Sequence, residues 1–194
     1  MAEGGLSLGS ADFSVLTVRG VRFQGDIDLT RCLFEGPVRF INCRFRRIDM
    51  ALAKFNGPLL LGWCSTPEER IEEIILRDAK FNFTKIQNQH IGSIDMFGTH
   101  MPQTCSLRGS SIGELDLEGS TIEGELDIRG CSIGRLCLMD ICLLGRIGED
   151  WNTIRDSKQA TTKDIRRWNR LLREGGSEGR MREIMGSDEK VPDS

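Results

Sequence analysis

The sequence lacks the motifs on which most enzymes and metal sites depend. It contains only two histidines, His90 and His100, and neither lies in a recognised nucleophile or zinc-binding motif. Of the seven cysteines, no two have the spacing of a metal knuckle or a redox-active CxxC pair. The glycines form no phosphate-binding loop. These absences predict a protein without catalytic residues, metal or cofactor.

Segments that direct a chain to or across a membrane are also missing. The opening MAEGGLSLGS has neither the basic region nor the apolar core of a secretory signal. No run approaches the roughly 18 apolar residues that a spanning helix needs. We therefore expect a cytoplasmic protein with no transmembrane segment, in which the cysteines are thiols.

No region has a large excess of charge of one sign. The formal net charge is −3, with 8 basic and 6 acidic residues in 1–58, 8 and 13 in 59–146, and 10 and 10 in 147–194. A basic surface for nucleic acid would need a much stronger positive excess. We therefore expect no direct binding of nucleic acid.

What the sequence does contain is a short repeat. From Leu16 to Gly145 a phrase recurs about every 10 or 11 residues. It begins with two apolar residues separated by a single residue. A short polar gap, a small residue, one further residue and then Phe, Ile or Leu follow. The clearest copies are LDLEGSTIEGE (115–125) and LDIRGCSIGR (126–135), and two phrases together span about 21 residues. The alternation within a phrase has the period of a β-strand.

Strands this short cannot form useful hairpins, but they can form the coils of a parallel β-solenoid, each pairing with the next at about 4.8 Å. The sequence therefore predicts an all-β parallel β-helix of about six coils, followed by a C-terminal α-helix. The predicted organisation is an N-terminal lead or cap at 1–15, a solenoid at 16–146 with a loop insertion at 62–73, a helical cap or partner helix at 147–176, and a mobile tail at 177–194.

Each phrase has a small inward position and, two residues later, a large apolar one. With coils 21 residues apart, Phe34 is expected to lie over Phe55, and Phe23 over Phe45. This arrangement predicts an aromatic core in the N-terminal half and an aliphatic core in the C-terminal half. The small position explains three thiols as buried small side chains rather than metal or redox groups: Cys32, Cys43 and Cys131.

One interruption separates Leu61 from Ile74. Its Ser-Thr-Pro-Glu-Glu run is typical of a helix N-terminus. We expect a short protruding loop with one helical turn. Trp63 at the root of this loop is either a core plug or an exposed contact.

The phrases LDLEG–STIEG, LDIRG–CSIGR and LCLMD–ICLLG resemble pentapeptide repeats, with Leu or Phe at the centre and a small residue two places earlier. The resemblance extends over about 16–146. It departs from a strict five-residue period, because an extra residue enters at most second corners. The resemblance implies a right-handed quadrilateral β-helix. Some members of that family are similar to duplex DNA in shape and charge and bind type II topoisomerases.

Acidic residues recur at one outward position of the repeat and form a row. The outward residue between the first two apolar positions is Asp at four places: Asp28, Asp49, Asp95 and Asp116. Five further acidic residues add to the charge near 114–127: Glu114, Glu118, Glu123, Glu125 and Asp127. The row is either a solvated face or a surface that binds a basic partner or imitates a row of phosphates.

After Ile147 the phrase stops, and apolar residues recur at helical spacing among arginines. An amphipathic helix is predicted from about Thr162 to Glu174. It would cap the open end of the solenoid, bind a partner (including a second copy of the chain), or bind nucleic acid or an anionic membrane through its arginines. Its candidate contact residues are Trp168, Leu172, Arg166 and Arg170.

Together these features favour a non-enzymatic β-solenoid that serves as a binding or assembly module. It would mediate protein–protein interaction through the acidic face and the C-terminal helix, in a homodimer or with another protein. The alternative is a DNA mimic that modulates a type II topoisomerase or another DNA-binding enzyme. An enzyme or lipid-associated protein with an unrecognised site is a third possibility.

Overall fold

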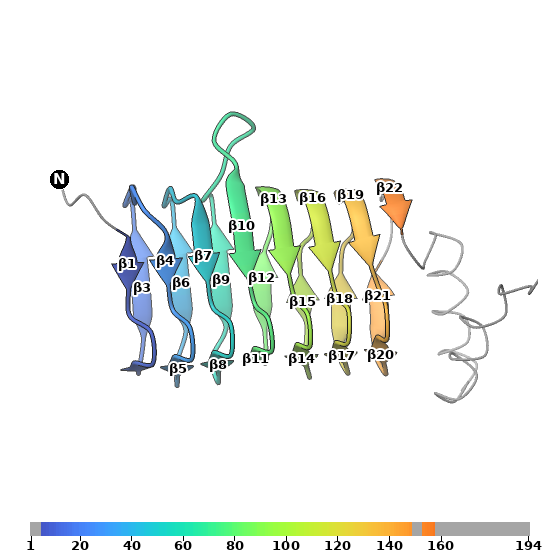
Figure 1. The fold of residues 1–194 in the computed structure, drawn as a ribbon, viewed down its shortest axis with the longest axis horizontal. Coiled ribbons are helices and arrows are strands. Elements are labelled where there is room, and N and C mark those ends of the chain that lie inside the picture. The colour runs from blue at the N-terminus through green and yellow to red at the C-terminus, as the bar shows by residue number, and fades with distance from the viewer. Residues whose placement is uncertain (1–4, 149–152, 158–194) are drawn as a thin grey trace, which may run out of the picture.

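The computed structural model describes residues 5–148 and 153–157, in which all regular secondary structure is β-strand. The strands wind into a parallel solenoid of about seven turns, and each turn contributes one strand to each of three sheets (Figure 1). No helix long and apolar enough to cross a membrane occurs in these two ranges.

The three sheets, here called A, B and C, contain eight, seven and seven strands. Sheet A consists of β1 (Leu6–Ser7), β4 (Ile27–Asp28), β7 (Arg47–Asp49), β10 (Ile71–Ile75), β13 (His90–Asp95), β16 (Ser111–Asp116), β19 (Ser132–Cys137) and β22 (Thr153–Ser157). Sheet B consists of β2 (Asp12–Phe13), β5 (Leu33–Phe34), β8 (Lys54–Phe55), β11 (Lys80–Phe81), β14 (His100–Met101), β17 (Thr121–Ile122) and β20 (Cys142–Leu143). Sheet C consists of β3 (Leu16–Arg19), β6 (Val38–Ile41), β9 (Leu59–Gly62), β12 (Thr84–Ile86), β15 (Cys105–Ser106), β18 (Glu125–Asp127) and β21 (Arg146–Gly148).

The solenoid is longer than the six coils predicted from the repeat. Its first turn begins at Leu6, within the segment 1–15 that was expected to be a lead or cap. The repeat is hard to recognise there because the inward residues of this turn are only half-buried. At the other end, β22 extends sheet A to Ser157, inside the segment 147–176 that was expected to be helical. The predicted helix at 162–174 and the tail at 177–194 lie outside the described residues.

The inward side chains stack in continuous rows, because parallel pairing in register places each residue over its counterpart one turn away. In sheet B the predicted stacking of Phe34 on Phe55 is confirmed, with ring centroids 4.9 Å apart. Phe13 stacks on Phe34 at 5.3 Å. At the next side of the turn the Phe23 N–H donates to the Arg44 carbonyl, beside Phe45. The inward row of sheet B reads Phe13, Phe34, Phe55, Phe81, Met101, Ile122 and Leu143.

Each turn has one strand in each of three sheets, whereas the resemblance implies four sides. In the longer strands of sheet A two buried residues lie three positions apart, such as Ile91 and Ile94 in β13. A single strand of sheet A therefore contributes two side chains to the core. The extra residue of the repeat falls at a corner that often contains glycine. A Cβ on Gly124 would collide with the Gln103 carbonyl of the preceding turn, so this corner requires glycine.

The three cysteines predicted to be buried, Cys32, Cys43 and Cys131, are buried, Cys142 is half-buried, and the described residues contain no disulfide. Cys32 and Cys131 donate their S–H groups to the carbonyls of Leu8 and Leu107 on the preceding turn. Burial raises the pKa of Cys131 to about 11 and that of Cys105 to about 12. At neutral pH these thiols are protonated and unreactive.

The interruption of the repeat forms a loop at 63–70, between β9 and β10, that stands out from the solenoid (Figure 1). The predicted helical turn is absent. The Glu69 N–H donates to Thr66 Oγ1, as at a helix start, but the chain enters β10 at Ile71 before a turn can form. Trp63 is 75% exposed, so the alternative of an exposed residue is the correct one.

Candidate functional site

The four predicted aspartates lie in one row on the outer face of sheet A. Asp28 is in register with Asp49, and Asp95 with Asp116. Ile75 occupies the row between Asp49 and Asp95. The row therefore consists of two carboxylate pairs separated by an apolar side chain.

Each of these aspartates caps the corner that follows its strand. Its Oδ1 accepts a hydrogen bond of 3.0 Å from the backbone N–H two residues further on; the donors are Thr30, Ala51, Phe97 and Glu118. A short side-chain acceptor at this position satisfies a backbone donor that the turn leaves unpaired. The recurrence of Asp every turn thus has a structural cause, independent of any partner.

The pKa of Asp28 shows the effect of this hydrogen bond. It is lowered, first by the Thr30 backbone N–H and then by the Thr30 hydroxyl, which donates to the same oxygen at 2.8 Å. Ser7 on the preceding turn also donates to this carboxylate. The ionised form of Asp28 is therefore favoured in the folded protein.

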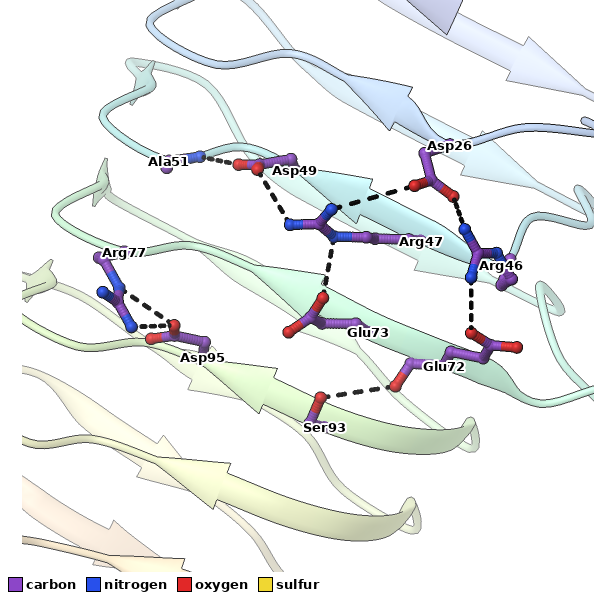
Figure 2. A network of polar contacts seen from close by, with 10 residues as sticks. All are labelled: Asp26, Arg46, Arg47, Asp49, Ala51, Glu72, Glu73, Arg77, Ser93 and Asp95. Carbon is purple, nitrogen blue, oxygen red and sulfur yellow. Dashed lines mark hydrogen bonds and ion pairs between the residues drawn. The ribbon is translucent and has the colours of Figure 1, made fainter. Parts of the chain in front are cut away.

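In the N-terminal half, arginines pair with Asp49 of the row and with the acids beside it (Figure 2). Arg47 contacts Glu73 at 2.8 Å and Asp49 at 3.5 Å. Arg46 bridges Asp26 and Glu72 at 2.9 and 3.2 Å. These charges alternate in sign along and across the turns. The N-terminal part of sheet A is thus a mixed ion-pair network rather than an acidic face.

A further ion pair lies in the middle of the solenoid. Arg77 contacts Asp95 at 2.7 Å, and its guanidinium lies 5.3 Å from the centre of the Phe97 ring (Figure 2). Of the four aspartates in the row, Asp28 and Asp116 are those that take part in no ion pair with a described residue.

The acidic residues predicted at 118–127 do not share one face. Glu118 follows β16 in sheet A, whereas Glu125 and Asp127 lie on β18 in sheet C. Glu123, at the corner after β17, contacts the His100 Nε2 at 2.9 Å. They were predicted to lie together because they are close along the chain. The chain changes direction at each corner, however, so successive strands belong to different sheets.

The two carboxylates on β18 are largely compensated. Glu125 contacts Arg146 at 3.0 Å, and Asp127 accepts from the Arg129 Nε at 2.6 Å. Burial opposes ionisation of Asp127, but the Arg129 hydrogen bonds and charge outweigh it and lower the pKa of Asp127. This pair stabilises the corner after β18.

Three acids that form no ion pair with a described residue lie close together at the corner between sheets A and B in the C-terminal half. We call Asp116, Glu118 and Asp140 the acidic corner patch; none forms an ion pair within 5–148 and 153–157. Phe97, 37% exposed, precedes Glu118 in the same corner row. Asp140 and Phe97 were not predicted. The signal available was their spacing of about one turn from Glu118, Phe97 before it and Asp140 after it.

One group of side chains has metal-ligand chemistry. The ligand atoms of Asp116, Glu118 and Cys137 all lie within 4.8 Å of one another. Burial, followed by the charges of the two carboxylates, raises the pKa of the Cys137 thiol. A protonated thiol is a poor ligand, and Asp116 already caps a corner. The group therefore gives little support to a metal site.

The remaining predicted contacts fall in the C-terminal helix, outside the described residues: Trp168, Leu172, Arg166 and Arg170. Nothing in the geometry above depends on them.

Comparison with known proteins agrees with the fold. A family model described as pentapeptide repeats (9 copies) matches residues 19–61. No curated protein and no solved structure gives a significant match to the chain. The matched segment forms the second and third turns of the same stacked register that continues to β22. The repeat match over 19–61 and the parallel solenoid that continues from it together support the pentapeptide-repeat family for this chain.

Proposed function

We propose that the protein is a non-enzymatic binding module that docks a basic protein surface on the acidic corner patch. The observation that carries the proposal is the contrast in charge pairing along the outer side of sheet A. Arg46, Arg47 and Arg77 pair with neighbouring acids on its N-terminal and central strands, whereas the three patch residues form no ion pair with a described residue.

The patch has the composition of a protein-binding surface. Its carboxylates would steer and orient a basic partner, while the exposed Phe97 ring offers an apolar anchor beside them. The Asp116 carboxylate is fixed by its hydrogen bond to the Glu118 N–H, so its position is set before binding. Pentapeptide-repeat solenoids are generally non-catalytic, which supports a binding role.

Affinity capture with charge-reversal variants tests this proposal. Glu118→Lys combined with Asp140→Lys should abolish recovery of the partner, because neither side chain caps a corner and the fold should persist. The matched control is Asp12→Lys combined with Glu68→Lys, which reverses two exposed acids elsewhere. Equal recovery with both pairs of substitutions would refute the proposed surface.

The C-terminal segment is proposed as a second contact, through which the chain binds a second copy. Full-length protein should then be a dimer in light scattering, and Trp168→Glu with Leu172→Glu should convert it to a monomer. A monomer before substitution would rule out this contact.

DNA mimicry by the acidic row has less support. A phosphate-like row needs continuous uncompensated charge, yet Ile75 interrupts the row and arginines pair with Asp49 and Asp95. A supercoiling assay with a type II topoisomerase tests it. Inhibition would favour this alternative over the protein-docking patch.

A further inference from the structure

A groove of about 280 Å³ lies beside the protruding loop, on the outer face of sheet A. Pro67 and Arg70 of the loop form one wall. The floor crosses three successive turns and includes His90, Ser111 and Ser132. These three residues are in register, so they form a polar row about 4.8 Å apart.

The loop that forms the wall is anchored at its base. Gln89, which is almost fully buried, accepts a hydrogen bond from the Cys64 N–H through its Oε1, and the Ser65 hydroxyl donates to the same atom. The His90 N–H in turn donates to the Ser65 Oγ at 2.7 Å. The loop and the first residue of the groove floor are thus joined by hydrogen bonds, and the groove exists before any ligand binds.

The charges of the loop are divided between its two sides. Glu69 pairs with Arg22 and Arg44, and Glu72 with Arg46, all on turns N-terminal to the loop. The Glu69 and Glu72 carboxylates are therefore paired on the side of the loop away from the groove.

Arg70 lines the opposite, C-terminal side. It forms no ion pair with any residue of the two described ranges. The remaining loop carboxylate, Glu68, is exposed. Glu114, which adjoins the floor, pairs with Arg135 at 3.1 Å. The groove therefore has a cationic wall and no uncompensated acid on its floor.

Part of the groove floor consists of glycines, because the turns pack too closely there to admit a side chain. A Cβ on Gly113 would collide with the Gly92 carbonyl, and one on Gly134 with the Gly113 carbonyl. Next to these glycines, the Ser111 and Ser132 hydroxyls accept and donate no hydrogen bond with described residues. A bound group can thus approach the hydroxyl row without obstruction.

We propose that this groove binds a phosphate monoester, independently of the acidic corner patch. The Arg70 guanidinium would form a forked contact with two phosphate oxygens, and the Ser111 and Ser132 hydroxyls and the His90 ring would donate to the others. Charge-assisted, forked contacts of this kind are the usual means by which arginine recognises phosphate.

Titration of the full-length protein with O-phospho-L-serine, followed by amide NMR shifts, tests the site. Shifts should centre on Arg70, His90, Ser111 and Ser132, and L-serine should cause none. Arg70→Gln should weaken binding at least tenfold. Lys85→Gln, which removes an exposed charge on β12, should change it less than twofold. Equal effects of the two substitutions, or shifts centred elsewhere, would overturn the proposal.

The source of the phosphate is distinguished by two further ligands. Tighter binding of a phosphoserine peptide than of inorganic phosphate would support a phosphorylated protein segment, and equal binding would support a small phosphate ester. Absence of binding by all three phosphates would refute the site. Circular dichroism of Arg70→Gln should match the parent, so that loss of binding is not loss of fold.

Discussion

The two halves of the solenoid build the same turn from different side chains. In sheet B the inward row is Phe from the first turn to the fourth and becomes Met, Ile and Leu in the last three. The backbone register is unchanged across this transition. The parallel ladder therefore sets the shape of the turn, and the core is filled by any apolar side chains of suitable size.

The corners between sheets A and B differ in the same way. One row of corner residues has positive φ along its length, from Arg31 (58°) and Leu52 (61°) to Gly98 (64°) and Gly119 (65°). Glycine relieves the strain of this conformation at Gly98 and Gly119, whereas side chains bear it at Arg31 and Leu52 and again at Asp140 (50°). The requirement belongs to the corner, not to the residue that fills it.

Charge completes the comparison. On sheet A, Arg46 and Arg47 pair with the acids around them in the N-terminal half, while at the corner after β16 Asp116 and Glu118 form no ion pair with a described residue. The first arrangement stabilises the surface modestly; the second leaves a surface able to attract a partner. The loop at 63–70 stands near the boundary between the two.

The largest expected effect concerns the core that both halves share. Phe34→Asp and Ile122→Asp should each unfold the protein, because each places an unpaired charge in a fully buried position. Circular dichroism and thermal melting measure the loss. Leu33→Asp, at the neighbouring outward position, should remain folded. Survival of one inward variant but not the other would show that the two halves fold separately.

A reciprocal exchange at the corner should have the next largest effect. Gly119→Leu should destabilise the fold by about 1–2 kcal/mol, because leucine is strained at positive φ although space is available. Leu52→Gly should stabilise it by about 0.5–1 kcal/mol for the opposite reason. Urea denaturation measures both. Destabilisation by Leu52→Gly would mean that its side chain contributes more than its strain costs.

A smaller gain is expected at a polar position in the core near the boundary. Thr84 is fully buried in sheet C, and its hydroxyl has no hydrogen-bond partner among the residues that the structure describes. Thr84→Val keeps the shape and should raise the free energy of unfolding by about 1 kcal/mol. Thr121→Val, at an outward position of sheet B, is the control and should be nearly neutral. A loss of stability in Thr84→Val would indicate that the hydroxyl is satisfied in solution.

The smallest expected effect is the pH dependence of stability at two carboxylates, the corner cap Asp28 and the ion-paired Asp127. Asp28 and Asp127 both have lowered pKa values, so their ionised forms stabilise the fold above about pH 4, and this contribution is lost as the pH falls through the folded-state pKa. The stability gap between the parent and Asp28→Ala, or Asp127→Ala, should therefore narrow between pH 7 and pH 3. High salt should narrow the Asp127 gap more, because Arg129 contributes to it. Gaps independent of pH would contradict both assignments.

The parts of the structure that repeat at a fixed distance could be predicted from the sequence. The stack of Phe34 on Phe55 follows from a spacing of 21 residues, and burial of the cysteines follows from the small position of the phrase. The ion pairs could not be predicted in this way. Arg46 reaches Asp26 across 20 residues but Glu72 across 26, because the loop lengthens that turn.

The aspartate row was placed correctly but interpreted only as a surface. Its capping hydrogen bonds depend on the direction of each corner N–H, which hydropathy does not reveal. The phosphate groove combines a loop residue, Arg70, with residues from three later turns, and no single phrase contains that combination.

The stacking of turns in register is tested most directly by engineered disulfides on sheet B. Lys54 and Lys80 are in register on adjacent turns, and both are exposed. Lys54→Cys with Lys80→Cys should therefore form a disulfide on mild oxidation, measured by mass spectrometry of a non-reduced digest. Leu33→Cys with Lys80→Cys places the thiols two turns apart and should form none. Cross-linking of the second pair in preference to the first would contradict the register and, with it, the surfaces derived from it.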